Sequence, residues 1–312
     1  MKTQEFTRAS IEHPERDEDA IMLFTGNGGD KAPVFAMIDG MGGQQHELPD
    51  GTMMTGHEAS QMVRATLIED LQRLPADVDA SAGGEAEQKV IAALIRAHQR
   101  VRLELNNGDE FAAPHRVGAV ATVVVVCENG GRLLGVQVGD TRGYLLTDGE
   151  LIQLCPDEDN IEYFIRSGLL TAEDGEQIGT ILNTYNGVDE PPVTGTVTIS
   201  GSPYEMYMAW RWFLVGNSVL NIPPANIVIN ALGIHAVDPV PLTSRIEIAA
   251  GDTLLLCSDG LYKNLTEAEI IDGLAHDESS ANELGEAAFT RSQAADNRRS
   301  TRDDISAIVA EW

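Results

Sequence analysis

The chain has 312 residues, of which 43% are hydrophobic and 22% charged, an ordinary balance for a globular protein. Its formal net charge is −28, because 49 acidic residues stand against 21 basic ones. A field of this sign disfavours binding to nucleic acid and to anionic membrane surfaces.

The predicted elements alternate between strands and helices along the chain. In order, they are strands at about 21–24 and 34–38, helices at 57–74 and 90–105, strands at 119–127, 132–138, 142–147, 150–154 and 253–257, helices at 266–275 and 280–295, and a strand at 305–310. Apolar residues recur every three or four positions in the helices, whereas the strands are continuous apolar runs. This order favours a sheet sandwich with helices outside.

Two stretches differ from the rest in composition. Residues 44–55 are rich in Gly, Pro, Asp and Met and have no clear period, which predicts a loop. Residues 186–224 contain two tyrosines and two tryptophans, Tyr204, Tyr207, Trp210 and Trp212. These aromatics either form a surface for a partner or, as is more common for aromatic strand positions, belong to a local core.

Aspartates recur where apolar, strand-like runs stop or start. They are Asp39, Asp140 and Asp259, each after such a run, and the pair Asp303-Asp304, before the last one. If the strands share one sheet system, their ends bring these carboxylates to a single edge. Crowded carboxylates repel one another, and a hard divalent cation bound through oxygen compensates for the repulsion. The sequence therefore predicts a metal enzyme, although any one of these aspartates taken alone is more often a turn residue.

Eight short motifs together carry a family resemblance. In chain order they are Glu18-Asp-Ala20, Phe35-Ala-Met-Ile-Asp-Gly-Met-Gly-Gly43, Gly56-His-Glu-Ala-Ser60, Gly118-Ala-Val-Ala-Thr122, Val138-Gly-Asp-Thr-Arg142, Ala231-Leu-Gly233, Gly251-Asp-Thr-Leu-Leu-Leu-Cys-Ser-Asp-Gly260 and Arg302-Asp-Asp-Ile-Ser306. Their content and order resemble the metal-dependent protein phosphatases of type 2C in their bacterial form. Residues 161–174 also resemble the flap of the bacterial members.

The resemblance implies an α+β fold with four layers, αββα. A central antiparallel β-sandwich is flanked by antiparallel α-helices on both faces, with a metal centre in a cleft at one end. Residues 1–312 would form a single phosphatase catalytic domain. Within it we expect a flap at about 156–186 and an inserted segment at about 187–224, the latter a contact for a substrate or regulator.

Site residues carry over from the family position by position. Two or three Mn²⁺ or Mg²⁺ ions are implied, because oxygen-only sites suit hard cations. Asp39 resembles the carboxylate that bridges two ions, with the Gly40 carbonyl on one of them, and Asp259 and Asp303 resemble the ligands of the second ion. Glu18 and Asp19 resemble the acidic pair that contacts metal-bound waters. The remaining residue with a proposed ligand role is Asp140, which resembles a ligand of a third, weaker ion.

The chain departs from the family at several positions. The arginine that binds phosphate lies four residues before the glutamate in the family, where this chain has Pro14, so Arg16 is a candidate by proximity alone. Met41 stands where animal members have a histidine thought to protonate the leaving group. A metal-bound water is then the expected proton donor, with His46 and His57 as less favoured alternatives.

The implied activity is hydrolysis of phosphoserine and phosphothreonine in proteins by water activated between two metals, without a phosphoenzyme. We expect a cytoplasmic protein, since the N-terminus has no signal peptide and no stretch approaches the ~18 apolar residues of a membrane span. The net charge favours a monomer, and the resemblance implies that the protein opposes a bacterial-type Ser/Thr kinase. Two alternatives remain open: an inactive pseudophosphatase that serves as a scaffold, and a phosphatase dedicated to one regulator of transcription.

The cysteines and the lysines qualify this picture. Cys127, Cys155 and Cys257 are widely spaced, and we expect them to be buried, free thiols of a reducing compartment. Lysine is scarce, with four residues in the whole chain. An acidic, lysine-poor surface suggests either a salt-rich habitat or a self-repelling soluble surface.

Overall fold

The structure is a computed structural model that describes residues 1–26, 29–41, 45–108, 116–184, 192–222, 228–234, 236–241, 246–275, 280–294 and 300–312. The ends of several predicted segments lie outside these residues: Gln44 of the loop, 185–186 of the flap, 187–191 and 223–224 of the insertion, and Ala295 of the last helix. Within the described ranges, no helix combines the length and hydropathy that a membrane span requires.

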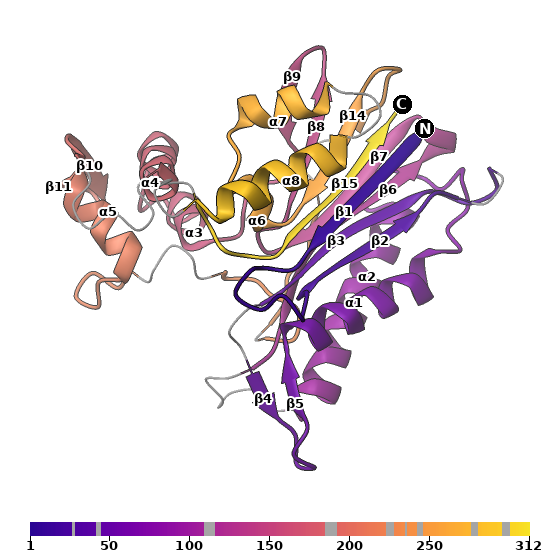
Figure 1. The fold of residues 1–312 in the computed structure, drawn as a ribbon, viewed down its shortest axis with the longest axis horizontal. Coiled ribbons are helices and arrows are strands. Elements are labelled where there is room, and N and C mark those ends of the chain that lie inside the picture. The colour runs from indigo at the N-terminus through magenta and orange to yellow at the C-terminus, as the bar shows by residue number, and fades with distance from the viewer. Residues whose placement is uncertain are drawn as a thin grey trace.

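Two antiparallel sheets form the centre of the fold (Figure 1). One has six strands in the order β12-β7-β6-β3-β2, with β13 also paired to β7. Its strands are β2 (Asp19–Phe24), β3 (Val34–Gly40), β6 (Ala119–Cys127), β7 (Arg132–Val138), β12 (Val240–Pro241) and β13 (Ile246–Glu247). The other has five, in the order β1-β15-β14-β8-β9. These are β1 (Lys2–Arg8), β8 (Arg142–Thr147), β9 (Glu150–Gln153), β14 (Thr253–Cys257) and β15 (Ile305–Glu311).

Helices cover the outer face of each sheet, as Figure 1 shows. On the six-stranded sheet lie α1 (Gly56–Leu71) and α2 (Glu85–Arg100), which continues into the π-helical turn η1 (Val101–Leu105). On the five-stranded sheet lie α7 (Glu267–Leu274) and α8 (Ser280–Ser292), preceded by the short α6 (Asp259–Tyr262). The predicted four layers, helix, sheet, sheet, helix, are confirmed.

The central strands are buried on both faces, and successive side chains alternate between the two buried layers. In β3, Val34, Ala36 and Ile38 pack against the helices, while Phe35 and Met37 point into the space between the sheets. Successive side chains of a strand point to opposite faces, so a strand buried on both sides is a continuous apolar run. The other central strands divide in the same way between the helix-facing layers and the layer between the sheets.

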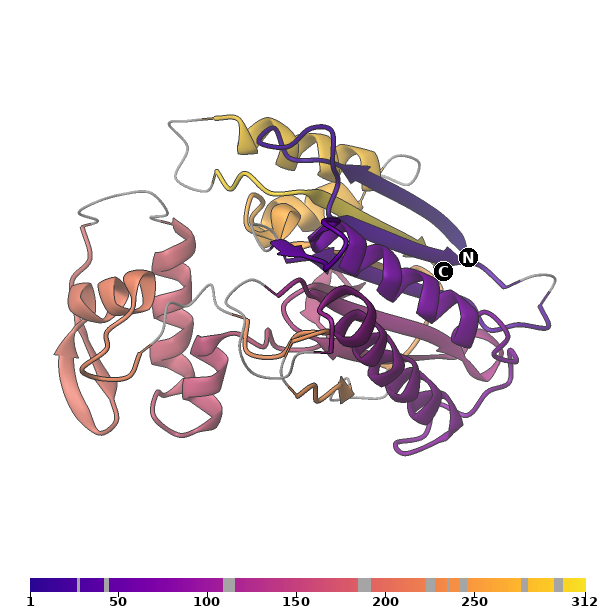
Figure 2. The ribbon, with the colours of Figure 1, turned by 90° about the horizontal axis from the view of Figure 1, so that it is seen from below.

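A side module, formed by α3 (Asn160–Arg166), α4 (Ala172–Thr184), β10 (Thr196–Ile199), β11 (Ser202–Glu205) and α5 (Met206–Val215), lies beside the sandwich (Figures 1 and 2). Its elements share a core of their own, in which the rings of Phe164 and Phe213 meet edge to face at 5.4 Å. The predicted flap and insertion thus pack on each other. That residues 1–312 form one catalytic domain with these two parts stays a prediction.

Tyr204 lies on β11, as expected of a strand position, but Tyr207, Trp210 and Trp212 lie on the helix α5, so the expectation of strand positions was wrong for these three. Met206, Ala209, Trp210 and Phe213 are the buried residues of α5. Their spacing of three, one and three residues places them on one face of a helix. Burial of this face within the module favours the helix, although aromatic residues have a high propensity for strands. The expectation of a local core was right for Trp210, which is 1% exposed.

Other differences from the predictions are local. The predicted loop 44–55 contains a small hairpin, β4 (Gln45–Glu47) and β5 (Met53–Thr55), in its described part. Strand β1 was not predicted, because it is polar and has one buried side chain, Phe6. The second helix begins earlier than expected, at Glu85. A 3-10 turn, η2 (Glu128–Gly130), joins β6 to β7, and the three cysteines are buried and free, as expected.

Candidate metal centre

Strand pairing in the six-stranded sheet brings the first acidic residues together. Asp19 opens β2 and lies directly opposite Asp39, at the end of β3. The Gly40 amide donates to the Glu18 carbonyl at 3.0 Å, which holds the next residues side by side. A Cβ on Gly40 would lie 2.2 Å from the Gly56 carbonyl oxygen and 2.7 Å from that of Glu18, so glycine is required for this close approach.

The five-stranded sheet contributes two further carboxylates. Asp259 follows β14 and begins α6, and Asp303 precedes β15, the neighbour of β14. Gly260 lets the two segments meet, because a Cβ there would lie 2.0 Å from the Asp304 carbonyl oxygen. Asp140 lies in the connection between β7 and β8, where the chain crosses from one sheet to the other. Both sheets therefore supply carboxylates to one end of the sandwich.

These carboxylates act on one another electrostatically. Burial raises the pKa of Asp39 well above its usual value, and the charges of Asp19, Asp259, Asp303 and Asp140 raise it further. Because the pKa of Asp39 depends on residues from both sheets, the fold must place the predicted carboxylates close enough for their charges to affect one another.

Two members of the set have pKa values near neutrality. Burial and the charge of Asp259 raise the pKa of Asp303 to about 8 against the opposing charge of Lys263. The pKa of Asp140 is raised to about 7, chiefly by burial, and Lys263 again opposes the shift. Without a bound cation, the carboxylate cluster is thus costly to ionise fully.

The donor set fits a hard divalent cation. Every candidate side chain offers carboxylate oxygens, and Oδ1 of Asp259 is buried without a hydrogen-bond partner in the described part of the chain. Among those same residues, no three His, Cys, Asp or Glu side chains converge closely enough to enclose one ion. Mg²⁺ and similar ions usually keep several waters when they bind to proteins. Carboxylates that are too far apart to enclose an ion directly can therefore still hold one partly through water.

Lys263 is the site residue that the sequence analysis did not single out. It lies one helical turn after Asp259, and its ammonium contacts Oδ2 of that aspartate. Burial alone would lower the pKa of Lys263, but the charges of Asp259 and Asp140 outweigh this and raise it. The available signal was the spacing of four residues from an aspartate in a helix, which places the two side chains on one face.

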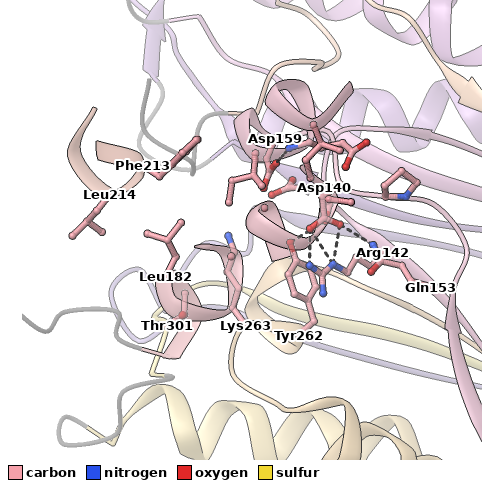
Figure 3. Close-up of a pocket in the computed structure, with 18 of the residues that line it drawn as sticks. Asp140, Arg142, Gln153, Asp159, Leu182, Phe213, Leu214, Tyr262, Lys263 and Thr301 are labelled. Carbon is pink, nitrogen blue, oxygen red and sulfur yellow. Dashed lines mark hydrogen bonds and ion pairs between the residues drawn. The ribbon is translucent and has the colours of Figure 1, made fainter. Parts of the chain in front are cut away.

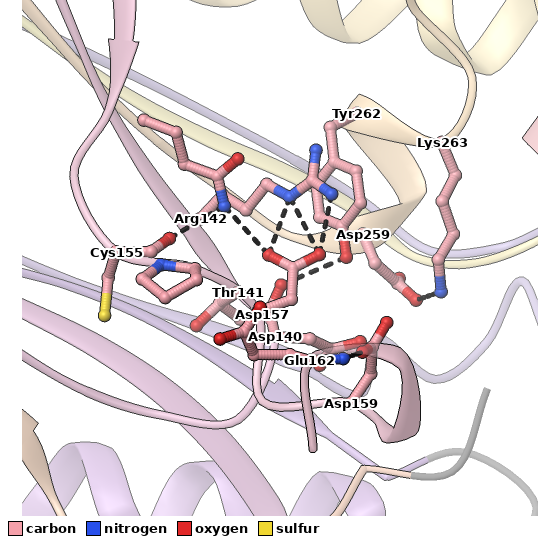
Figure 4. Close-up of polar contacts among 12 residues, drawn as sticks. Asp140, Thr141, Arg142, Cys155, Asp157, Asp159, Glu162, Asp259, Tyr262 and Lys263 are labelled. Carbon is pink, nitrogen blue, oxygen red and sulfur yellow. Dashed lines mark hydrogen bonds and ion pairs between the residues drawn. The ribbon is translucent and has the colours of Figure 1, made fainter. Parts of the chain in front are cut away.

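Arg142 forms a pair with an acidic residue beside the candidate ligands. Its Nε lies 2.8 Å from Oδ1 of Asp157 and its Nη2 lies 2.6 Å from Oδ2, a bidentate contact (Figure 4). Its Nη1 donates to the Tyr144 hydroxyl at 2.8 Å. The guanidinium carbon lies 3.6 Å from the centre of the Tyr262 ring. Since the Tyr262 hydroxyl donates to the Asp140 carbonyl at 3.0 Å, this network holds the backbone of a candidate ligand.

Of the remaining predicted residues, Arg16 contacts one of the carboxylates, and the two histidines lie on other segments. Arg16 places Nε 3.2 Å from Oε1 of Glu18, beside the carboxylates. Nδ1 of His57 lies 2.6 Å from the Asp17 carbonyl, and His46 lies on β4 of the hairpin that extends from the sandwich (Figure 1).

Asp304, expected to add charge beside the metals, anchors the chain that leads to Glu18. Its two oxygens accept hydrogen bonds from the amides of Ser10 and Glu18, each at 2.6 Å. Burial raises its pKa, and these two hydrogen bonds oppose the rise.

A cavity of about 610 Å³ lies between the carboxylates and the side module (Figure 3). Asp140, Lys263 and Asp303 line one side, and apolar residues such as Phe213 and Leu182 line the other. A charged wall faces an apolar wall, and because carboxylates predominate on the charged wall, an anionic group would be accepted there only together with a cation.

Residues 9–300 match the family model described as protein phosphatase 2C. The serine/threonine protein phosphatase PstP of Mycobacterium tuberculosis is 27% identical over 282 residues, which cover 90% of this chain and 40% of that protein. The chain therefore spans less than half the length of this relative. The serine/threonine phosphatase stp of Listeria innocua is 24% identical over 266 residues, covering 84% of this chain and 78% of that one.

Solved structures show the same fold. The M. tuberculosis phosphatase PstP/Ppp superposes with a TM-score of 0.61 at 23% identity, over 99% of this chain and 97% of that one. Stp1 of Staphylococcus aureus gives a TM-score of 0.65 at 18% identity, over 100% and 95%. With the match of the family model over nearly the whole chain, these likenesses lead to one conclusion: the chain belongs to the protein phosphatase 2C family.

Proposed function

We propose that this protein is a metal-dependent phosphatase that hydrolyses phosphoserine and phosphothreonine in proteins. The observation that carries the proposal is the convergence of carboxylates from both sheets, among them Asp39, Asp259 and Asp303, on one field beside a cavity. Membership of the protein phosphatase 2C family supports the activity, as do relatives that are named serine/threonine phosphatases. A PstP catalytic domain of the same fold was solved in complex with two manganese ions, which supports Mn²⁺ or Mg²⁺ as cofactor.

Asp39, Asp259, Asp303 and the Gly40 carbonyl would hold the cations, with Glu18 and Asp19 beside them. Bound divalent cations would neutralise phosphoryl oxygens and lower the pKa of water at the site, so that hydrolysis proceeds near neutral pH. The protein's own part is to hold these donors in place through the paired strands and the two glycine contacts. Such preorganisation avoids reorganising charges during the reaction.

Substrate phosphate and leaving group need partners of their own. Arg16, at the edge of the carboxylates, is the candidate for binding phosphate oxygens. Of the described residues that line the cavity, none is a histidine. We infer that water, and not His46 or His57, protonates the serine or threonine oxygen as it leaves.

The finer parts of the proposal concern the cell. We propose a cytoplasmic protein, monomeric because of its strong self-repulsion, whose substrates are a Ser/Thr kinase and the targets of that kinase. A scaffold without activity remains the second candidate, since Arg16 does not stand at the family's arginine position. A phosphatase dedicated to one regulator of transcription differs from the first candidate in substrate alone.

Hydrolysis of p-nitrophenyl phosphate and of a phosphothreonine peptide tests the proposal, measured with Mn²⁺, with Mg²⁺ and with EDTA. We expect turnover that requires metal and that Asp39→Asn reduces by at least ~100-fold, the scale of losing a principal electrostatic group. Asp77→Asn is the matched control, because it removes one carboxylate from an exposed turn. A folded wild-type protein without turnover in either metal would favour the scaffold.

A further inference from the structure

Lys263 brings a positive charge into the candidate metal centre. It is one of four lysines in a chain with 49 acidic residues, and its side chain lines the cavity (Figure 3). The side chain is 28% exposed, and its ammonium contacts Oδ2 of Asp259 (Figure 4). Oδ1 of the same carboxylate is buried and has no hydrogen-bond partner among the described residues. The two oxygens of Asp259 are therefore in different environments, one with a cation and one without.

Three aspartates from three different segments act on this ammonium: one is in contact with it, and the other two line the same cavity. Asp259 begins α6, Asp140 lies in the connection between the two sheets, and Asp303 precedes β15. Conversely, the charge of Lys263 acts on both Asp140 and Asp303. A lysine ammonium is a compact point charge with three donors, so it can satisfy carboxylates on more than one side.

We propose that Lys263 is a built-in cation that takes the place of a divalent ion between Asp259 and Asp140. The inference rests on the proposed metal centre. Divalent ions would then be confined to the part of the cluster around Asp39, Oδ1 of Asp259 and Asp303. Asp140 would be neutralised by lysine and would not bind metal, in contrast to the expectation from its sequence position.

The physical reason is competition for the same oxygens. A tethered ammonium is present at high local concentration and is not lost by dilution, whereas a weakly held divalent ion is. It also repels any divalent ion that approaches Asp140, because like charges at short range oppose each other. A lysine with a structural role alone would contribute to stability without changing how many ions the cluster binds.

Metal binding, measured independently of activity, tests this. Protein stripped with a chelator is titrated with Mn²⁺, and the signal of free Mn²⁺ in electron paramagnetic resonance gives the number of bound ions and their dissociation constants. We expect Lys263→Met to bind one more ion per chain than the wild type, or to bind its weakest ion at least tenfold more tightly. Lys263→Arg, which keeps the charge, should bind as the wild type does.

Two further variants assign the effect. In Lys263→Met/Asp140→Asn, the additional ion should disappear, which places it at Asp140. Lys89→Met is the matched control, because Lys89 forms an exposed pair with Glu85 on α2 and its loss changes the net charge equally. Lys89→Met should leave the binding curve unchanged. Circular dichroism melts in EDTA establish that each variant is folded, and Lys263→Gln replaces Lys263→Met should the latter not fold.

The outcomes separate this inference from the proposed function. A wild type that binds Mn²⁺, with a folded Lys263→Met that has the same stoichiometry and affinity, would overturn the inference and leave the metal centre standing. Binding by Lys263→Met alone would overturn the inference, because the wild type would then hold no ion around Asp39 and Asp303. Absence of Mn²⁺ binding in every variant would overturn the metal centre and the inference together.

Discussion

Individual residues around the site differ in whether they hold the structure or take part in the chemistry. Arg142 is an example of the first kind, because its guanidinium contacts Asp157 and Tyr144. The side chains of Arg142 and Asp157 are 21% and 15% exposed, so the charges are largely removed from water. A pair in this situation depends on both partners, because removing one leaves the other buried without compensation.

Arg142→Met is therefore expected to lower the free energy of unfolding by about 3 kcal/mol, the usual effect of breaking a buried pair. The double variant Arg142→Met/Asp157→Asn should lose less than the sum of the two single variants, since no charge is left without its partner. Urea denaturation of the four proteins gives the coupling energy. Strict additivity of the two substitutions would contradict the proposed coupling.

At the scale of elements, the close approach of α6 to the segment before β15 brings two candidate ligands together. Gly260 has no positive φ, so glycine is needed there for space alone. A methyl group at 2.0 Å from a backbone oxygen cannot be accommodated without moving one of the two segments. Asp259 and Asp303 would then separate.

Gly260→Ala is predicted to destabilise the protein by about 1–3 kcal/mol, the range for overpacking, and to weaken Mn²⁺ binding. The matched control is Gly179→Ala in α4, where the new methyl would meet Ile161 at an ordinary 3.8 Å. That change should be neutral or should stabilise the protein by up to ~1 kcal/mol through helix propensity. Thermal melts and calorimetric Mn²⁺ titrations measure both effects; equal behaviour of the two variants would refute the role of Gly260.

The contact between α7 and α8 makes stability depend on pH. Glu269 caps α7 with Thr266 and pairs with Arg291 of α8, and the hydrogen bond from Arg291 is the main reason that its pKa is lowered to about 2. A lowered carboxyl pKa adds stability above the unfolded value of ~4.3, and this is lost as pH falls towards 2.

Glu269→Gln should therefore reduce the free energy of unfolding by about 1 kcal/mol at pH 7, a modest effect because the side chain is partly exposed. The difference from the wild type should shrink between about pH 5 and pH 2. Denaturation at a series of pH values measures it. A difference that stays constant over this range would mean that the charge of Glu269 is not involved.

At the scale of the whole molecule, a net charge of −28 acts on every part of the fold. Like charges repel, and folding brings them closer together, so this repulsion destabilises the folded state relative to the unfolded state. Salt screens this repulsion, with a Debye length that falls from ~30 Å at 0.01 M to ~3 Å at 1 M ionic strength. The candidate metal centre adds to the effect in the metal-free protein, since its carboxylates outnumber the one ammonium, that of Lys263, which contacts Asp259.

We predict that KCl raises the thermal midpoint of the metal-free protein by at least ~3 °C between low and molar concentration, equivalent to roughly 2 kcal/mol for a chain of this length. Melts in EDTA measure this without interference from divalent ions. Sucrose at matched osmolality controls for effects of the solute that are not electrostatic. An unchanged midpoint would mean that the acidic surface is not limiting, and would count against adaptation to a salt-rich habitat.

Local and periodic information was enough to predict most of the elements and the fold. Continuous apolar runs identified the buried strands, because a strand between two layers has no polar face. Periodicity located the flanking helices within a few residues. Of the elements that were missed, two illustrate the physical reasons: β1 is polar because it is an edge strand, and α5 is aromatic because its module buries it on one side.

The sequence by itself determined that carboxylates end the strands, that the surface is strongly acidic and that the motifs follow the order of one family. Only the tertiary structure decided how those carboxylates are shared. Asp304 holds the segment before Glu18, Asp157 pairs with Arg142, and Asp259 divides its oxygens between Lys263 and the candidate metal position. Each of these assignments depends on contacts between segments distant in sequence, or on burial, and neither follows from local pattern alone.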